Sequence, residues 1–197
     1  VFYKQTAAPE PIVLIKEDFG TGSPVCGLPG VPSNWGCGTP DNHHYISGYN
    51  NGYLDSNGCW ITPYDHTNPS PTSDGRFAFY NIGNVGGMGS GGILYEKHVK
   101  DIEPNQPIKY KLYLFNVVHI GCNIIRPNVE IRLVDSGGNV ITSQSSGEIA
   151  PNNRNREDWH EFSGQLNPGT NTEFSIQIRS IAVGYSGNDL AIDDIYV

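Results

Sequence analysis

The chain ends with Asn188-Asp-Leu-Ala-Ile-Asp-Asp-Ile-Tyr-Val197, an apolar stretch interrupted by two adjacent carboxylates, Asp193 and Asp194. Its β-branched and aromatic residues favour an extended strand. Side chains in a strand alternate between two faces. The expected sets are Ala191, Asp193 and Ile195 on one face and Leu190, Ile192 and Asp194 on the other. One carboxylate therefore turns toward the core, and alternation does not say which.

A second acidic pair, Glu17-Asp18, lies in the first apolar stretch, residues 11–19. Burying a carboxylate without a partner is costly in free energy. Acidic residues inside predicted strands at both ends of the chain therefore indicate that a hard cation joins the two ends.

The remainder of the chain predicts an all-β fold, an antiparallel β-sandwich. Apolar and polar residues alternate with a period of two at residues 107–115, 128–134 and 173–179. Further strands are expected at 75–81, 92–99, 139–143 and 159–166. The expected inward-facing residues are Ile108, Tyr110, Leu112, Leu114, Val129, Ile131, Leu133, Phe174, Ile176 and Ile178. Many strands without a helical period are typical of a sandwich.

Length and charge restrict the class of protein. A chain of 197 residues buries one sizeable core, so residues 1–197 are expected to form a single domain, with residues 1–10 as an N-terminal extension. The net charge of −8, without clusters of Lys or Arg, argues against nucleic acid or an anionic membrane as partner. No apolar run is long enough to insert into a bilayer.

Residues 20–73 form a long loop region rich in Gly, Pro, Asn and Ser. A connection of this length is usually functional or carries small elements of its own. The region holds three of the four cysteines, which are Cys26, Cys37, Cys59 and Cys122. An even number without the paired spacing of a zinc site indicates disulfides and a secreted or cell-surface location. Cys26–Cys37 would close a short loop and leave Cys59–Cys122, but the sequence does not choose among the possible pairings.

The same loop region carries aromatic rings among polar side chains, the combination that sugar binding requires. The candidate ligand-binding residues are Trp35, Tyr45, Tyr49, Tyr53, Trp60, Asn50 and Asp55. The alternative is that Trp35 and Trp60 pack the loop onto the sandwich. A second aromatic group, Tyr95, Tyr113 and Phe115, is interpreted as packing on a sheet face.

Several motifs, taken in order, resemble a known kind of module. They are Glu17-Asp-Phe-Gly, Asp65-His-Thr, Asp74-Gly-Arg-Phe, Trp159 before Phe162, Arg126-Pro-Asn-Val-Glu-Ile-Arg, Phe174-Ser-Ile-Gln-Ile-Arg and the chain end Asn188-Asp-Leu-Ala-Ile-Asp-Asp-Ile. This order is similar to that of MAM-type and carbohydrate-binding-module-type domains, as found in large secreted surface adhesins of gliding bacteria. The resemblance covers most of the chain from Glu17 onward. It implies a jelly roll with galactose-binding-like topology.

The resemblance also implies a structural Ca²⁺ where the first and last strands meet a loop. Calcium takes six to eight oxygen ligands from carboxylates and carbonyls. The ligands carried over are Glu17, Asp65, Asp74 and Asp193, with Asp18 and a carbonyl near Thr67 as lesser candidates. Many such modules have Glu where this chain has Gly20, so the role on the first strand shifts to Glu17 and Asp18. The alternative is that these carboxylates cap turns or lie at solvated strand ends and bind no metal.

Catalytic motifs are poor. Trp159-His-Glu-Phe is not HExxH, and the chain has neither a GxSxG elbow nor a phosphate loop. Paired carboxylates hydrolyse glycosides when they face a cleft, but nothing in the sequence places two of them so. We therefore expect that this chain is not an enzyme.

The expected function is a calcium-stabilised, non-catalytic binding module of a cell-surface adhesin, with carbohydrate or a cell-surface glycan as its ligand. One alternative is a MAM-like structural or protein–protein adhesion module that binds no sugar. Another is an accessory domain of a polysaccharide-degrading enzyme.

Overall fold

The computed structural model describes residues 11–33, 35–38, 40–41, 43–49, 54–83, 92–122, 125–183 and 187–197. The N-terminal extension predicted for residues 1–10 lies outside these ranges. The described elements are β1 (Lys16–Glu17), β2 (Gly36–Cys37), β3 (His43–Ser47), the 3-10 helix η2 (Leu54–Asn57), β4 (Phe77–Asn81), β5 (Ile93–Val99), β6 (Ile108–Asn116), β7 (Asn128–Val134), β8 (Val140–Glu148), β9 (His160–Leu166), β10 (Phe174–Ser180) and β11 (Leu190–Tyr196). Within the described ranges, no helix is long and apolar enough to cross a membrane.

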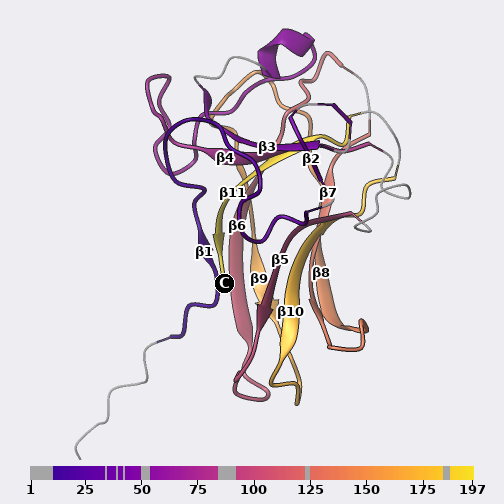
Figure 1. The fold of residues 1–197 in the computed structure, drawn as a ribbon. Helices are drawn as coiled ribbons and strands as arrows, with labels where there is room; N and C mark the ends of the chain where they lie inside the picture. The colour runs from indigo at the N-terminus through magenta and orange to yellow at the C-terminus, as the bar shows by residue number, and fades with distance from the viewer. Residues whose placement is uncertain are drawn as a thin grey trace, which may run out of the picture.

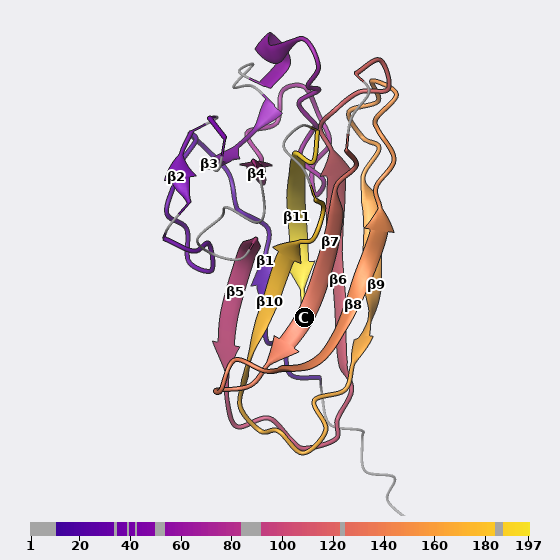
Figure 2. The ribbon, with the colours of Figure 1, turned by 90° about the vertical axis from the view of Figure 1, so that its right-hand side faces the viewer.

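The strands form an antiparallel β-sandwich, as the sequence predicts. The first sheet has the order β2-β3-β4-β11-β6-β9, and the second sheet has the order β5-β10-β7-β8. Figures 1 and 2 show the two sheets face to face, with the purple loop region gathered at one end. Only the short β2–β3 pair is parallel among the described strand pairs.

The strand order is that of a jelly roll. When β4 to β11 are numbered 1 to 8 along the chain, the first sheet reads 1-8-3-6 and the second reads 2-7-4-5. The chain passes from one sheet to the other between successive strands, except in the β7–β8 hairpin. This is the double-sheet arrangement of eight strands that defines a jelly roll.

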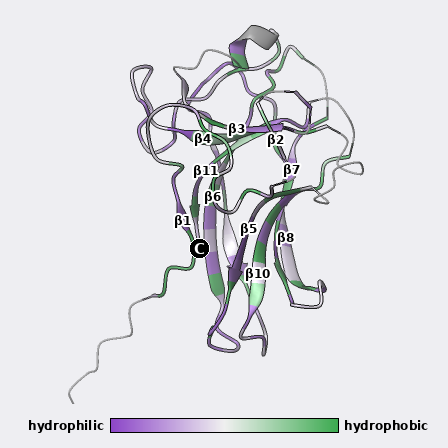
Figure 3. Ribbon diagram, viewed as in Figure 1, coloured by the Kyte–Doolittle hydropathy of each residue, from purple (hydrophilic) through white to green (hydrophobic). Residues whose placement is uncertain are grey.

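The main core lies between the sheets, and the predicted alternation places it correctly. All of the inward-facing residues expected on β6, β7 and β10 belong to one buried cluster. Polar residues alternate with them along the strands, as the purple and green segments of Figure 3 show. Because apolar burial contributes roughly 25 cal/mol per Å², this layer supplies most of the driving force for folding.

A second apolar layer covers the outer face of the first sheet. Its buried residues are Leu54, Ile61, Phe77, Phe79, Phe115, Val117, Val118 and Ala191, with Trp60, Cys122 and Trp159 packed against them. We call this set the outer cluster. Strand β4 is buried at every position, because one face meets the main core and the other meets the outer cluster. Residues 54–61 of the long loop region, which include η2, therefore form a covering layer on this face, whereas Trp35 of the same region is buried in the main core.

The first and last described strands lie side by side. Strand β1 pairs with the end of β11, with Lys16 opposite Tyr196 and Glu17 opposite Ile195. Ile15 and Val197 extend this pairing through main-chain hydrogen bonds in both directions. The strand expected over residues 11–19 is much shorter than predicted, since only β1 is strand.

Candidate functional site

A bulge near the end of β11 decides where its two carboxylates point. The register of β11 against β6 shifts between Asp193 and Tyr196, and Asp194 has a φ of 46°. Ile195 consequently joins Leu190 and Ile192 in the main core. The expectation that Ile195 shares a face with Asp193 is wrong, because an extra residue in a strand breaks the alternation.

Asp193 is fully buried and contacts the loop of residues 65–68. Its carboxylate accepts hydrogen bonds from the main-chain N–H of His66 (3.0 Å) and of Asp194 (2.8 Å). The carboxyl of Asp65 lies close enough for its charge to act on Asp193, while Asp65 accepts a bond from the N–H of Asn68 at 2.7 Å. Burial, with the charges of Asp65 and Asp194, raises the pKa of Asp193 well above the usual range. Burial likewise raises the pKa of Asp65.

The space for Asp65 depends on a neighbouring glycine. A Cβ atom added to Gly75 would lie 2.3 Å from the Asp65 Cγ atom, which is a severe clash. Gly75 therefore lets the main chain ahead of β4 approach the buried carboxyl pair closely.

Asp194 holds the same loop from outside. Its carboxylate accepts a hydrogen bond from the Thr67 hydroxyl (2.7 Å) and lies 2.6 Å from His66 Nδ1. The His66 ring stacks on Tyr113 of β6, with ring centroids 3.5 Å apart, and meets Trp159 edge-on at 6.0 Å. The His66 side chain is thus fixed on both its ring face and its Nδ1 edge.

A pocket opens beside these residues on the part of the first sheet that the loop leaves uncovered. Its volume is about 450 Å³, and it is lined by Lys16, Glu17, Asp18, His66, Thr67, Lys111, Tyr113, Asp194, Ile195 and Tyr196. Tyr196 is 44% exposed, so its ring is accessible. The Tyr113 hydroxyl donates a hydrogen bond to Glu161 at 3.2 Å. This pocket combines aromatic rings with hydrogen-bonding side chains.

The predicted calcium ligands are only partly brought together. Asp65 and Asp193 meet, and Thr67 lies next to them but binds Asp194. Asp74 is exposed. In the described part of the chain, no three His, Cys, Asp or Glu side chains gather into a group that would hold a metal ion. The predicted four-carboxylate set is therefore not assembled.

The acidic residues of β1 and its flank are held by their own main chain. Glu17 accepts a hydrogen bond from the N–H of Phe19 at 2.9 Å, and Asp18 accepts one from the N–H of Gly20 at 3.0 Å. Burial and the charge of Glu17 together raise the pKa of Tyr95 to about 12, which places Glu17 near that core residue. The donor chemistry thus fits a hard cation at Asp65 and Asp193, where two buried carboxyls face each other, better than at β1.

The two tryptophans predicted for sugar binding pack the loop onto the sandwich. Trp35 is only 6% exposed, its indole N–H donates to the Ile93 carbonyl at 2.7 Å, and its ring meets Tyr80 edge-on. Trp60 is half-buried against Phe79, with ring centroids 5.2 Å apart. A buried indole offers no face to a sugar, so the packing alternative accounts for Trp35.

Tyr49 and Asp55 belong to a separate polar group. Arg156 binds Asp55 at 2.7 Å and lies 4.8 Å from the Tyr49 ring centroid. Burial opposes ionisation, but the hydrogen bond and charge of Arg156 lower the pKa of Asp55. Tyr53 and Asn50 lie outside the described residues, as does the side chain of Tyr45.

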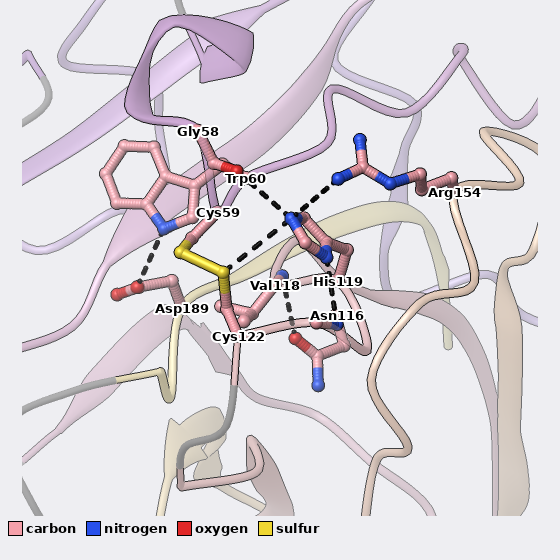
Figure 4. The surroundings of a disulfide bond; sticks show 10 residues. Gly58, Cys59, Trp60, Asn116, Val118, His119, Cys122, Arg154 and Asp189 are labelled. Atoms are coloured by element: carbon pink, nitrogen blue, oxygen red, sulfur yellow. Dashed lines mark hydrogen bonds between the residues drawn. A yellow bond between two sulfur atoms is a disulfide. The ribbon is translucent and has the colours of Figure 1, made fainter.

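The disulfides are Cys26–Cys37 and Cys59–Cys122, which resolves the pairing that the sequence left open. Figure 4 shows Trp60 on one side of the Cys59–Cys122 bond and His119 on the other. The indole N–H of Trp60 donates to Asp189 at 3.2 Å, and the N–H of Ile82 donates to the other oxygen at 2.9 Å. Burial raises the pKa of Asp189 to about 7 despite these bonds. Disulfide and carboxyl together fasten the covering loop to the first sheet.

Sequence reasoning missed most of the pocket. The sequence predicts that Tyr113 packs on a sheet face. It does not predict His66, Lys16, Lys111 or Tyr196 as ligand contacts. The one signal for them is the paired Asp193-Asp194, because a bulge at two adjacent carboxylates turns both toward the 65–68 loop.

Comparison with known proteins supports the fold. No protein-family model matches the sequence, and no curated protein matches it. The Stig cyclase Fisc of Fischerella sp. TAU, solved with (3Z)-3-(1-methyl-2-pyrrolidinylidene)-3H-indole, has a TM-score of 0.50 at 13% identity, over 98% of this chain and 90% of that chain. At this identity the likeness extends to the fold alone.

Two further solved structures are more distant. The CBM22-1–GH10 modules of xylanase 10B from Clostridium thermocellum, complexed with xylohexaose, give a TM-score of 0.42 at 10% identity, over 95% of this chain and 28% of that chain. The K3 cleaved adhesin domain of Lys-gingipain from Porphyromonas gingivalis w83 gives 0.39 at 14% identity, over 94% and 98%.

Proposed function

We propose that this chain is a non-catalytic, extracellular module that binds carbohydrate. The observation that carries the proposal is the pocket of about 450 Å³ beside the 65–68 loop, with the exposed ring of Tyr196 at its wall. Ligand sites of roughly 300–1,000 Å³ combine apolar or aromatic walls with a few fixed polar groups. A pyranose presents both an apolar ring face and hydroxyl groups, so it suits this lining.

The polar groups of the pocket are fixed before a ligand arrives. His66 is held by Asp194 and by stacking on Tyr113, while Thr67 is held by the same carboxylate. Side chains that are already ordered lose little conformational entropy on binding. This preorganisation favours recognition of a weakly binding, hydroxyl-rich ligand.

We also propose that Ca²⁺ stabilises the module at Asp65 and Asp193. Two buried carboxyls whose charges repel each other favour a proton or a cation between them, since two adjacent negative charges in a buried site are costly. Calcium would be held by their oxygens together with main-chain carbonyls. Its effect would be to pin the loop after Asp65 onto β11, and no chemistry at the pocket is assigned to it.

The extracellular setting is supported by the two disulfides, which persist in oxidising compartments. Attachment to a cell-surface adhesin is the context in which such a module would act. Sequencing of the gene would discriminate between contexts, since repeated β-domains in the same chain would indicate an adhesin and a catalytic domain would indicate an enzyme accessory.

A glycan array probed with the protein in Ca²⁺ and in chelator tests the proposal. We expect specific glycans to be bound, with weaker binding in chelator and recovery when Ca²⁺ is added back. No bound glycan in either condition would contradict carbohydrate binding and favour a structural or protein–protein module.

The chain offers a matched pair of variants that locates the site. His66–Asp194 and His98–Glu173 are both histidine–carboxylate contacts, at 2.6 and 2.9 Å, but only the first lies at the pocket. His66→Ala should weaken glycan binding, and His98→Ala should leave it unchanged. Equal effects of the two variants would place the glycan elsewhere.

A further inference from the structure

Three side chains form one row across the strands that border the pocket. Lys16 of β1 lies opposite Tyr196 of β11, and Tyr196 in turn lies opposite Lys111 of β6. These three strands run side by side in Figure 1, next to the C-terminal end. All three residues line the pocket, and Tyr196 is 44% exposed. In the register of the sheet, an accessible aromatic residue is therefore flanked by two lysines.

The two lysines are not neutralised by ion pairs within the described residues, where every salt bridge involves Arg or His. Lys111 Nζ lies 5.7 Å from the centroid of the Tyr113 ring. Such a contact is weak at an exposed site and leaves the ammonium available to a ligand.

The carboxylates around the pocket already have partners of their own. Glu17 accepts a bond from Phe19 N–H, and Asp18 accepts one from Gly20 N–H. Asp194 is bound on both oxygens by the side chains of Thr67 and His66. Each acidic group that lines the pocket thus has a partner on the chain itself, whereas neither lysine of the row makes an ion pair within the described residues. Beyond the lining, Glu161 lies near Lys111: hydrogen bonds from Ser163 and Tyr113, together with the charge of Lys111, lower the pKa of Glu161.

We propose that this row binds an anionic sugar, one that carries a carboxylate or a sulfate. The ring of Tyr196 lies against the apolar face of the pyranose, and Lys16 and Lys111 bind its charged group. This inference rests on the proposed carbohydrate-binding function and names the class of sugar. Hydrogen bonds from a charged donor to an anion are stronger than neutral ones, so charge decides between ligands here.

Calorimetric titration with three probes tests the charge. The probes are trigalacturonic acid, its methyl ester, and a sulfated carrageenan oligosaccharide, which separates the carboxylate from the sulfate. We expect the acid or the sulfated oligosaccharide to bind roughly tenfold or more tightly than the ester, since hydrogen bonds to charged groups contribute about 1.5–3 kcal/mol. The preference should shrink as salt is added.

Variants test the row itself. Lys16→Gln and Lys111→Gln should each weaken binding of the preferred anionic probe about tenfold, with little change for the ester. Tyr196→Ala should weaken all probes that bind. The matched control is Lys109→Gln, because Lys109 is an exposed lysine on the same strand, two residues before Lys111, and does not line the pocket.

The outcomes separate this inference from the proposed function. Equal binding of acid, sulfated probe and ester, or anionic binding that survives both lysine substitutions, would overturn the anionic sugar while carbohydrate binding stands. Anionic binding that is unchanged in Tyr196→Ala would overturn the row as the site. A glycan array without any bound sugar would remove the proposed function and this inference with it.

Discussion

The outer faces of the two sheets differ in what lies on them. Part of the first sheet is covered by the loop region, and Phe77, Phe79 and Phe115 are buried there in the outer cluster. The second sheet carries a polar row instead, in which Arg132 donates to Gln177 at 2.8 Å and Gln177 donates to Glu96 at 2.6 Å. The pocket lies on the first sheet where its cover ends. The partly covered face of the first sheet thus carries both the outer cluster and, where the cover ends, the pocket.

Phe79→Ala should reduce the free energy of unfolding more than any other change considered, because Phe79 is packed inside the outer cluster. Phe79 is fully buried and meets the Trp60 ring at 5.2 Å. Truncating a buried Phe costs about 3–5 kcal/mol of the free energy of unfolding. Urea denaturation followed by circular dichroism measures the loss. A loss below about 1 kcal/mol would show that the loop does not pack as a core layer.

The sequence predicted the facing of strands with one buried face, in both sheets, better than that of β4, for a physical reason. Strands with one buried face alternate, so Val129, Ile131 and Leu133 could be read as inward-facing from period alone. Residues 77–81, FAFYN, do not alternate, because both faces of β4 are buried. A non-alternating strand is a usable signal for a cover on both sides, although it does not say which segment supplies the cover.

The site was harder to predict than the fold because it depends on a local irregularity. The meeting of the first and last strands was expected from the resemblance, and β1 does pair with β11. The bulge at Asp194 could not be predicted in this way, since nothing in a period-two pattern marks an extra residue. Tyr196 and Lys111 become neighbours only through that register shift.

Removing the Cys59–Cys122 disulfide should loosen the cover from the first sheet. The two cysteines are 63 residues apart, against 11 for Cys26 and Cys37. Chain-entropy estimates give about 4 kcal/mol for the longer loop and about 3 kcal/mol for the shorter one. The double variants Cys59→Ala/Cys122→Ala and Cys26→Ala/Cys37→Ala, compared by urea denaturation, test this order. The reverse order would mean that the loop is held mainly by its packing.

Asp189 makes the attachment of the cover sensitive to pH. Its folded-state pKa of about 7 lies above the ordinary value of 3.8. A raised pKa means that the folded state binds the proton more tightly than the unfolded state. The stability from Asp189 is therefore full below about pH 4 and is lost as pH rises through about 7, on the order of 4 kcal/mol in all.

Asp189→Asn checks this pH dependence against the wild-type protein. The free energy of unfolding should fall less between pH 4 and pH 8 in the variant, because the group that titrates has been removed. Wild-type Trp60 fluorescence should also change with a midpoint near pH 7, since its indole N–H donates to Asp189. Parallel stability curves for the two proteins would contradict the assignment.

Arg132→Met should have the smallest effect, because it lies on the uncovered face of the second sheet. Arg132 binds Gln177 at 2.8 Å and lies 4.0 Å from Glu130, which also has Arg179 at 3.9 Å. The Arg132–Glu130 contact is long and only partly exposed, at 17% and 21% of the two side chains. Ion pairs at a protein surface contribute about 0–1 kcal/mol, and the Met side chain keeps the apolar part of the contact with the sheet. We expect a loss below about 1 kcal/mol in urea, reduced further by salt. A loss above about 3 kcal/mol, of the size that breaking a buried pair produces, would mean that this face is shielded from water as well. The contrast between a covered and an open sheet would then have to be abandoned, and the polar row would become a second place to look for a ligand.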